Sequence, residues 1–210
     1  MRIKWYGQSF FRIVFGGRGG TRIVIDPFSP DCGLELPTIK SHLMLVSHSD
    51  YNNSEAVRED PFIIDAPGEY EMKNAFVKAV EAENADEEQI TMFRIEADNH
   101  SIIHLGDLGQ EELTSDQIEE LGNVDVLLIP VGGGKTVGPS DASKLVTQIE
   151  PKAVIPMHYS ISGLEEDLEE VDDFLEAMGE EDVEPQEKFK VKPTNLPEDD
   201  FKVAVLEPDQ

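Results

Sequence analysis

The feature that most constrains the fold is an apolar run at residues 43–46 that breaks abruptly into polar side chains. The run reads LMLV, and residues 47–53 then read SHSDYNN. A buried strand that ends in polar residues delivers their side chains to one edge of a sheet, where sites form in α/β folds. Residues 101–107 (SIIHLGD) and 153–159 (AVIPMHY) repeat the pattern. We therefore expect three strand ends to bring together His48, Asp50, Asp107 and His158.

Several motifs, taken in their order along the chain, resemble the metallo-β-lactamase superfamily. They read VSHSDYNN, PGEYE, HLGDLG, LLIPVGG and PKAVIPMHY, and the likeness extends from KWYGQSFF near the start to Tyr159. The branch that is most similar contains small single-domain hydrolases, including the ascorbate-phosphate lactonases. The resemblance implies one domain over residues 1–210 with a four-layer αββα sandwich, in which helices flank two mixed β-sheets.

The family's His-x-His-x-Asp-His motif is incomplete in this chain, and its register stays open. If His48 is the first histidine, the later ligand positions hold Asp50 and two asparagines. If Asp50 is the family's aspartate, His48 is the second histidine, and Val46 and Tyr51 replace the other two. In both registers at least two ligand positions are lost, whereas one imidazole and one carboxylate remain.

The resemblance also assigns ligands outside this motif. Asp107 matches the metal-bridging aspartate and His158 matches the last histidine, but residues 76–84 lack the histidine that the family has there. Glu81 or Glu83 offers a carboxylate in place of this imidazole, since oxygen ligands also bind Zn²⁺ or Mn²⁺. The simpler interpretation of this acidic stretch is a solvated loop.

Two further residues are expected beside the ligands. The family has an acidic residue near its metals at the position of Asp26, although this residue can equally cap the turn before Pro27. His104 is expected to pack beside the site. The predicted metal ligands are thus His48, Asp50, Asp107 and His158, with Asp50 and Asp107 as the catalytic carboxylates. Two imidazoles and two carboxylates suit one Zn²⁺ or Mn²⁺ ion at most, or none.

The composition narrows the classes of partner. A net charge of −27, from 44 acidic and 17 basic residues, opposes binding to nucleic acid and to anionic membranes. The acidity indicates solubility or a salty cytoplasm. The functional alternative is that the negative charge produces an electrostatic field that attracts cations. Cys32 is the single cysteine, which fits a reducing compartment. The sequence has no apolar run near 18 residues and no leader, so we expect a cytoplasmic protein.

Three functions from different classes follow. The first is a metal-dependent hydrolase of a small ester, lactone or phosphoester. The second is a catalytically inactive pseudoenzyme that binds a ligand or protein in the same cleft, and the third is an acidic structural subunit. The intact motifs at Asp107 and His158 favour the first, which makes a small-molecule substrate the expected partner.

Local patterns predict the main elements. Residues 124–131 form the most apolar run, which predicts a strand in a sheet interior. The following glycines, residues 132–134, permit close approach of a ligand or form a plain connection. Glycines at residues 16–20 predict a hairpin turn. Helices are expected over residues 114–121, over 141–150 after a Ser140 cap, and along an apolar stripe from Leu164 to Met178.

Overall fold

The computed structural model describes residues 1–210 except for 17–18, 181, 192–195, 198–200 and 210. Its strands form a six-stranded sheet, a seven-stranded sheet and a two-stranded ribbon. The inner faces of the two large sheets share one apolar core. Aromatic contacts cross it, because the ring of Trp5 lies 4.9 Å from that of Tyr159 and the ring of Phe11 lies 5.8 Å from that of His104.

The six-stranded sheet is built from the amino-terminal strands, with the order β14-β1-β2-β3-β5-β7. Its members are β1 (Arg2–Trp5), β2 (Phe11–Val14), β3 (Arg22–Ile25), β5 (Leu43–Leu45), β7 (Phe62–Ile64) and β14 (Phe189–Lys190). The first three strands and β14 pair antiparallel, whereas β5 runs parallel to β3 and β7. The apolar run at residues 43–46 thus supplies β5, an interior strand of this sheet. Part of the predicted hairpin turn, residues 17–18, lies outside the described residues.

The seven-stranded sheet has the order β15-β13-β12-β11-β10-β9-β8. Its members are β8 (Gly68–Met72), β9 (Ala75–Glu83), β10 (Gln89–Ala97), β11 (His100–His104), β12 (Val126–Pro130), β13 (Ala153–Met157) and β15 (Lys202–Val203). Strand β12 is parallel to β11 and β13 on its two sides, and all its residues are buried. The prediction of an interior strand from its unbroken apolar run is therefore confirmed.

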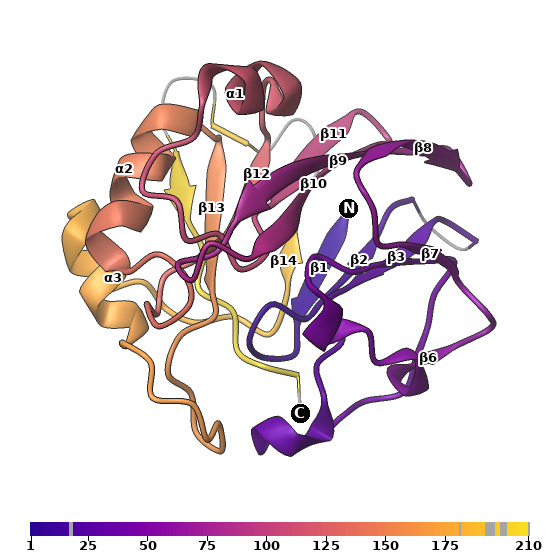
Figure 1. Ribbon diagram of the computed structural model, residues 1–210, viewed down its shortest axis with the longest axis horizontal. Coiled ribbons are helices and arrows are strands. Elements are labelled where there is room, and N and C mark those ends of the chain that lie inside the picture. The colour runs from indigo at the N-terminus through magenta and orange to yellow at the C-terminus, as the bar shows by residue number, and fades with distance from the viewer. Residues whose placement is uncertain (17–18, 181, 192–195, 198–200, 210) are drawn as a thin grey trace.

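Helices and short turns cover the outer faces of the sheets. The helices α1 (Ser115–Leu121), α2 (Pro139–Ile149) and α3 (Val171–Met178) lie together on the side of β12 and β13 (Figure 1). Part of the other sheet is covered by the 3₁₀ turns η1 (Pro30–Cys32), η2 (Ser49–Tyr51) and η3 (Ser54–Ala56) and by the ribbon of β4 (Ile39–Lys40) and β6 (Val57–Arg58). The αββα sandwich is thus confirmed, with turns in one outer layer. No helix in the described part of the chain is long and apolar enough to cross a membrane.

Two helix starts differ from the prediction. The apolar stripe from Leu164 is helical only from Val171 onward. Before it, the backbone of Glu169 donates to the carbonyl of Gly132 at 2.9 Å and accepts from the amide of Ser160 at 2.9 Å, so these groups serve tertiary contacts. Helix α2 begins at Pro139 after Gly138 as N-cap. The Ser140 cap was wrong because Pro139 already suits the first helical position.

Candidate functional site

A cavity of about 250 Å³ lies where β5, β11 and β13 end. All four predicted ligands line it, which is the outcome expected from the three strand ends. The remaining lining residues come mainly from loops and turns: Gln8, Phe28, Ser29, Cys32, Tyr51, Asn84, Lys135 and Glu166.

A buried carboxylate fixes the residue before His48. Asp26 follows β3 and is fully buried, and its two oxygens accept the backbone N–H of Ser47 at 2.7 Å and the hydroxyl of Ser47 at 2.6 Å. Burial raises the pKa of Asp26 well above its ordinary value, while both bonds from Ser47 act in the opposite direction. Asp26 therefore ties the end of β3 to the start of the polar segment and lies behind the cavity lining.

Asp107 is held by two hydroxyl groups. Its Oδ1 accepts from Ser9 Oγ at 3.1 Å, and its Oδ2 accepts from the Tyr51 phenol at 2.8 Å. Burial, followed by the negative charge of Asp107, raises the pKa of Tyr51 well above its ordinary value, so the phenol remains a proton donor. Gly106 turns the chain before Asp107 with φ 58°, and a Cβ there would lie 2.8 Å from the Ser47 side chain. Both carboxylate oxygens of Asp107, the residue that matches the family's metal-bridging aspartate, thus already accept a hydrogen bond.

His104 supports this arrangement from behind. It is fully buried, its Nε2 lies 3.0 Å from the carbonyl of Ser9, and its Nδ1 accepts the N–H of Gly106 at 3.1 Å. These partners assign a neutral ring with its proton on Nε2. Burial lowers the pKa of His104 to about 4, against the opposite effects of the Ser9 bond and the charge of Asp107. His104 therefore positions Ser9, which in turn holds Asp107.

This buried imidazole predicts acid sensitivity. The unfolded chain takes up the proton near pH 6.5, whereas the folded chain takes it up only near pH 4. The free energy of unfolding should therefore fall as pH decreases between these values, by about 3 kcal/mol in total. Asp26 acts in the opposite direction, because its raised pKa favours the folded state as pH falls. Urea unfolding across this range should show a weaker loss in His104→Gln than in wild type, and parallel curves would contradict the assignment.

His158 is the buried imidazole that faces the cavity. It follows β13 with φ 50°, and its backbone N–H donates to the carbonyl of Gln8 at 3.1 Å. Its side chain is 2% exposed, and within the described structure neither ring nitrogen has a hydrogen-bond partner. Glu166 Oε1 lies 3.8 Å from Nε2, and Gln8 Nε2 donates to the other oxygen of Glu166 at 3.1 Å. Unpaired buried donors and acceptors are costly, so a polar group that entered the cavity beside this ring would lower that cost.

His48 lies nearer the rim with acidic neighbours. Its Nδ1 is 3.6 Å from Asp50 Oδ2, and its Nε2 is 3.9 Å from Glu88 Oε2. Lys135 Nζ lies 3.7 Å from the same Glu88 oxygen. Glu81 and Glu83, the suggested substitutes for the missing imidazole, belong to β9 and do not line the cavity. The carboxylate near His48 is instead that of Glu88, which lies in the connection between β9 and β10.

The structure also distinguishes the residues of the incomplete motif. Tyr51 lines the cavity and bonds to Asp107, whereas Asn53 is used in local structure. The Asn53 amide donates to the carbonyl of Phe28 at 2.9 Å, and its oxygen caps η3 through the N–H of Glu55 at 3.2 Å. A tyrosine therefore occupies the cavity wall beside Asp107.

The donors fit a two-metal centre poorly. Among the residues that the structure describes, no three His, Cys, Asp or Glu side chains are close enough to hold one ion. The oxygens of Asp107 accept from hydroxyls, and His158 Nε2 lies 3.8 Å from a single carboxylate oxygen, Glu166 Oε1. The four predicted ligands share a cavity without forming one ligand cluster, and their metal-binding roles remain predictions.

Sequence reasoning missed several residues of the site. Gln8 and Ser9 belong to the KWYGQSFF segment but carried no chemical signal by themselves. Glu166 was one of many acidic residues on the outer face of the helix predicted from Leu164 to Met178, so nothing in the sequence distinguished it. Of the missed residues, Gln8 shares a structural signal with the predicted Asp26 and His158: all three are non-glycine residues with positive φ, at 45°, 49° and 50°. Such strained conformations persist where the surroundings enforce them, often at functional sites.

An αββα sandwich with a polar cavity at the strand ends is the architecture of the metallo-β-lactamase class. Residues 2–158 match the beta-lactamase superfamily domain, and the chain therefore belongs to this family. The resemblance inferred from the motifs is thus confirmed. A Thermotoga maritima structure of the metallo-β-lactamase superfamily is 33% identical with a TM-score of 0.80, covering 98% of this chain and 97% of its own.

Other relatives extend this comparison. A Bacillus cereus protein named UPF0173 metal-dependent hydrolase is 28% identical over 201 residues, covering 76% of this chain and 86% of the relative. The Bacillus mycoides protein of the same name is 29% identical over the same coverage. The structure of a metallo hydrolase from Ignicoccus hospitalis has a TM-score of 0.68 at 20% identity, covers 100% of this chain and 96% of its own, and supports the fold alone.

Proposed function

We propose that this protein is a metal-dependent hydrolase of a small ester, lactone or phosphoester that uses at most one ion, Zn²⁺ or Mn²⁺. The observation that carries the proposal is the buried His158 ring in the cavity, whose two nitrogens have no partner among the described residues. The Bacillus relatives named metal-dependent hydrolases support the reaction class. The cavity of about 250 Å³ suits a small substrate.

The chain's own residues have distinct proposed roles. His158 and Glu166 would hold the ion, and Gln8 orients the Glu166 carboxylate. A bound ion would supply Lewis acidity and a water that ionises near neutral pH. Lys135 lines the cavity and offers a cation to an anionic substrate.

The catalytic carboxylates of this proposal are Asp50 and Asp107. Asp50 is exposed beside His48, and this pair can accept a proton from water at the rim. Asp107 is fixed in one orientation by its two hydroxyl donors, so it would align groups in the cavity rather than move with them.

A second candidate is the inactive pseudoenzyme that binds a ligand in the same cavity. One observation favours it: the Ser9 and Tyr51 hydroxyls satisfy both oxygens of Asp107 without any metal. The carboxylate keeps its charge, but these charge-assisted hydrogen bonds stabilise it without a cation.

Metal analysis of protein purified without chelators separates the candidates. We expect at most one Zn²⁺ or Mn²⁺ per chain, and at least about tenfold weaker binding in His158→Gln. His100→Gln is the matched control, because His100 is also buried, its Nδ1 has no hydrogen-bond partner among the described residues, and it lies outside the cavity. Hydrolysis of ester, lactone and phosphoester panels should follow metal occupancy.

Three outcomes contradict the hydrolase proposal in different ways. Two tightly held ions per chain would show that the site rearranges into a full family centre. No binding at millimolar metal, together with saturable binding of a panel compound, would support the pseudoenzyme. Hydrolysis that persists in metal-free protein would show that the reaction does not require a metal ion.

A further inference from the structure

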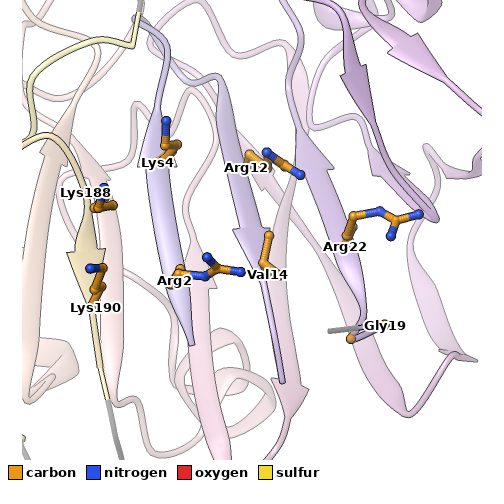
Figure 2. A pocket seen from close by; sticks show the side chains of 9 residues that line it. Arg2, Lys4, Arg12, Val14, Gly19, Arg22, Lys188 and Lys190 are labelled. Carbon is orange, nitrogen blue, oxygen red and sulfur yellow. The ribbon is translucent and has the colours of Figure 1, made fainter. Parts of the chain in front are cut away.

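A basic cavity lies on the outer face of the six-stranded sheet, away from the candidate site. Its volume is about 360 Å³, and six of the chain's 17 basic residues line it. Figure 2 shows these side chains side by side on neighbouring strands. We call this surface the basic face; its cations are Arg2, Lys4, Arg12, Arg22, Lys188 and Lys190.

Strand alternation explains why these side chains point outward. In β1, Ile3 and Trp5 enter the core between the sheets, so Arg2 and Lys4 take the outer positions. The same period of two turns Arg12 of β2 outward. Strand alternation explains why polar residues lie on the solvated face, but it does not explain why these residues all carry a positive charge.

The strand register makes the concentration of charge unfavourable. Arg2 lies directly opposite Lys190 of β14, and Lys4 lies directly opposite Arg12 of β2. Like charges at opposed positions of antiparallel strands are destabilising. Two such pairs on one face oppose stability unless a negative charge lies against them.

Neutralisation within the chain is incomplete. Lys4 pairs with Asp209 at 2.5 Å and Arg22 pairs with Glu59 at 2.9 Å. Within the described residues, neither Arg2, Arg12 nor Lys190 has a carboxylate within 4.0 Å. The Nε atoms of Arg12 and Arg22 are buried and lack a hydrogen-bond partner in the same part of the chain. Unsatisfied guanidinium donors therefore border this cavity.

The size of the basic face selects the kind of anion. It spans four strands, about 14 Å at the usual strand spacing of about 4.8 Å. Guanidinium groups bind phosphate oxygens in pairs, and lysines add point charges. A long nucleic acid would also meet the acidic remainder of the surface. A compact anion within the Debye length of about 8–10 Å responds mainly to the nearby cations.

We propose that the basic face binds a compact anion that carries two or more phosphate groups. Such a ligand places separate phosphates against the opposed cation pairs. None of the residues that line this cavity lines the candidate hydrolase site, so the proposal stands independently of the proposed reaction.

Isothermal titration calorimetry with tripolyphosphate tests this directly, with orthophosphate and sulfate as simpler anions. Wild type should bind one tripolyphosphate saturably, more tightly than either simple anion. The double variant Arg2→Gln/Lys190→Gln should weaken binding at least about tenfold, because it removes one opposed pair. The matched control Lys78→Gln/Lys144→Gln changes the net charge equally at sites outside the basic face, and it should bind within about twofold of wild type.

Each other result overturns the proposal. If wild type shows no saturable binding, the basic face is not a site for such an anion. Equal losses of affinity in both double variants would show that binding depends only on the net charge of the chain. Tighter binding of an oligonucleotide than of tripolyphosphate would assign the surface to nucleic acid. Self-association that disappears in Arg2→Gln/Lys190→Gln would assign it to an acidic surface of a second copy. Thermal unfolding checks that the variants fold, and Lys190→Gln alone replaces the double variant if they do not.

Discussion

Gly132→Ala should lower the free energy of unfolding by about 3 kcal/mol or more, as overpacking against backbone does. An added Cβ would lie 2.3 Å from the carbonyl oxygen of His158 and 2.9 Å from Tyr159 Cα. The amide of Gly132 donates to that carbonyl at 2.9 Å, so the two segments are also tied by a hydrogen bond. Because the clashing atoms are backbone, no rotamer change relieves the contact. Urea unfolding monitored by circular dichroism measures the loss.

Gly179→Ala is the matched control. Gly179 ends α3 with φ 71°, but a Cβ there would meet nothing within 4 Å. Its cost should be about 1 kcal/mol, from the left-handed backbone alone. If both substitutions cost the same, the close approach of Gly132 to His158 has no energetic weight. The Gly132→Ala protein that remains folded should also bind metal less well, since its His158 is displaced.

Tyr51→Phe should raise the affinity of the cavity for a divalent cation at least about tenfold. The substitution removes the phenol that donates to Asp107 Oδ2 at 2.8 Å and keeps the ring that fills the wall. Asp107 then has a buried carboxylate oxygen without a donor, which costs about 1–3 kcal/mol or more for a charged group. A cation in the cavity recovers part of this cost, and about 1.4 kcal/mol corresponds to a tenfold change. Titration with Zn²⁺ and Mn²⁺ measures the change.

Two further variants make this test specific. Tyr70→Phe removes a phenol that bonds to the Ala66 carbonyl at 3.0 Å on an exposed part of β8, and its metal affinity should equal that of wild type. Asp107→Ala should cancel the gain when combined with Tyr51→Phe. If Tyr51→Phe binds metal no better than wild type, Asp107 does not lie within reach of the ion. The hydroxyl bonds would then be a purely structural feature of the cleft.

Several features of the fold were determined by local sequence pattern. The unbroken apolar run of β12 predicted its interior place, because a strand covered on both faces excludes polar side chains. The apolar runs that end in polar residues predicted that His48, Asp107 and His158 would line one cavity. Helix α1 begins after Thr114, whose capping box with Gln117 satisfies amides within one turn. Each of these signals acts between residues that are close in the chain.

The chemistry of the site was decided by contacts between distant residues. The hydrogen bond of Tyr51 to Asp107 connects segments that follow strands of different sheets. The approach of Glu166 to His158 depends on the segment before Val171, which was predicted to be helical but instead bonds to Gly132 through its backbone. The basic face likewise depends on the register that opposes Arg2 to Lys190, near the two ends of the chain. Periodicity shows which face of an element is apolar, but it cannot show which residue of a remote element lies opposite. That pairing follows from the packing of the whole core, and only the tertiary structure contains it.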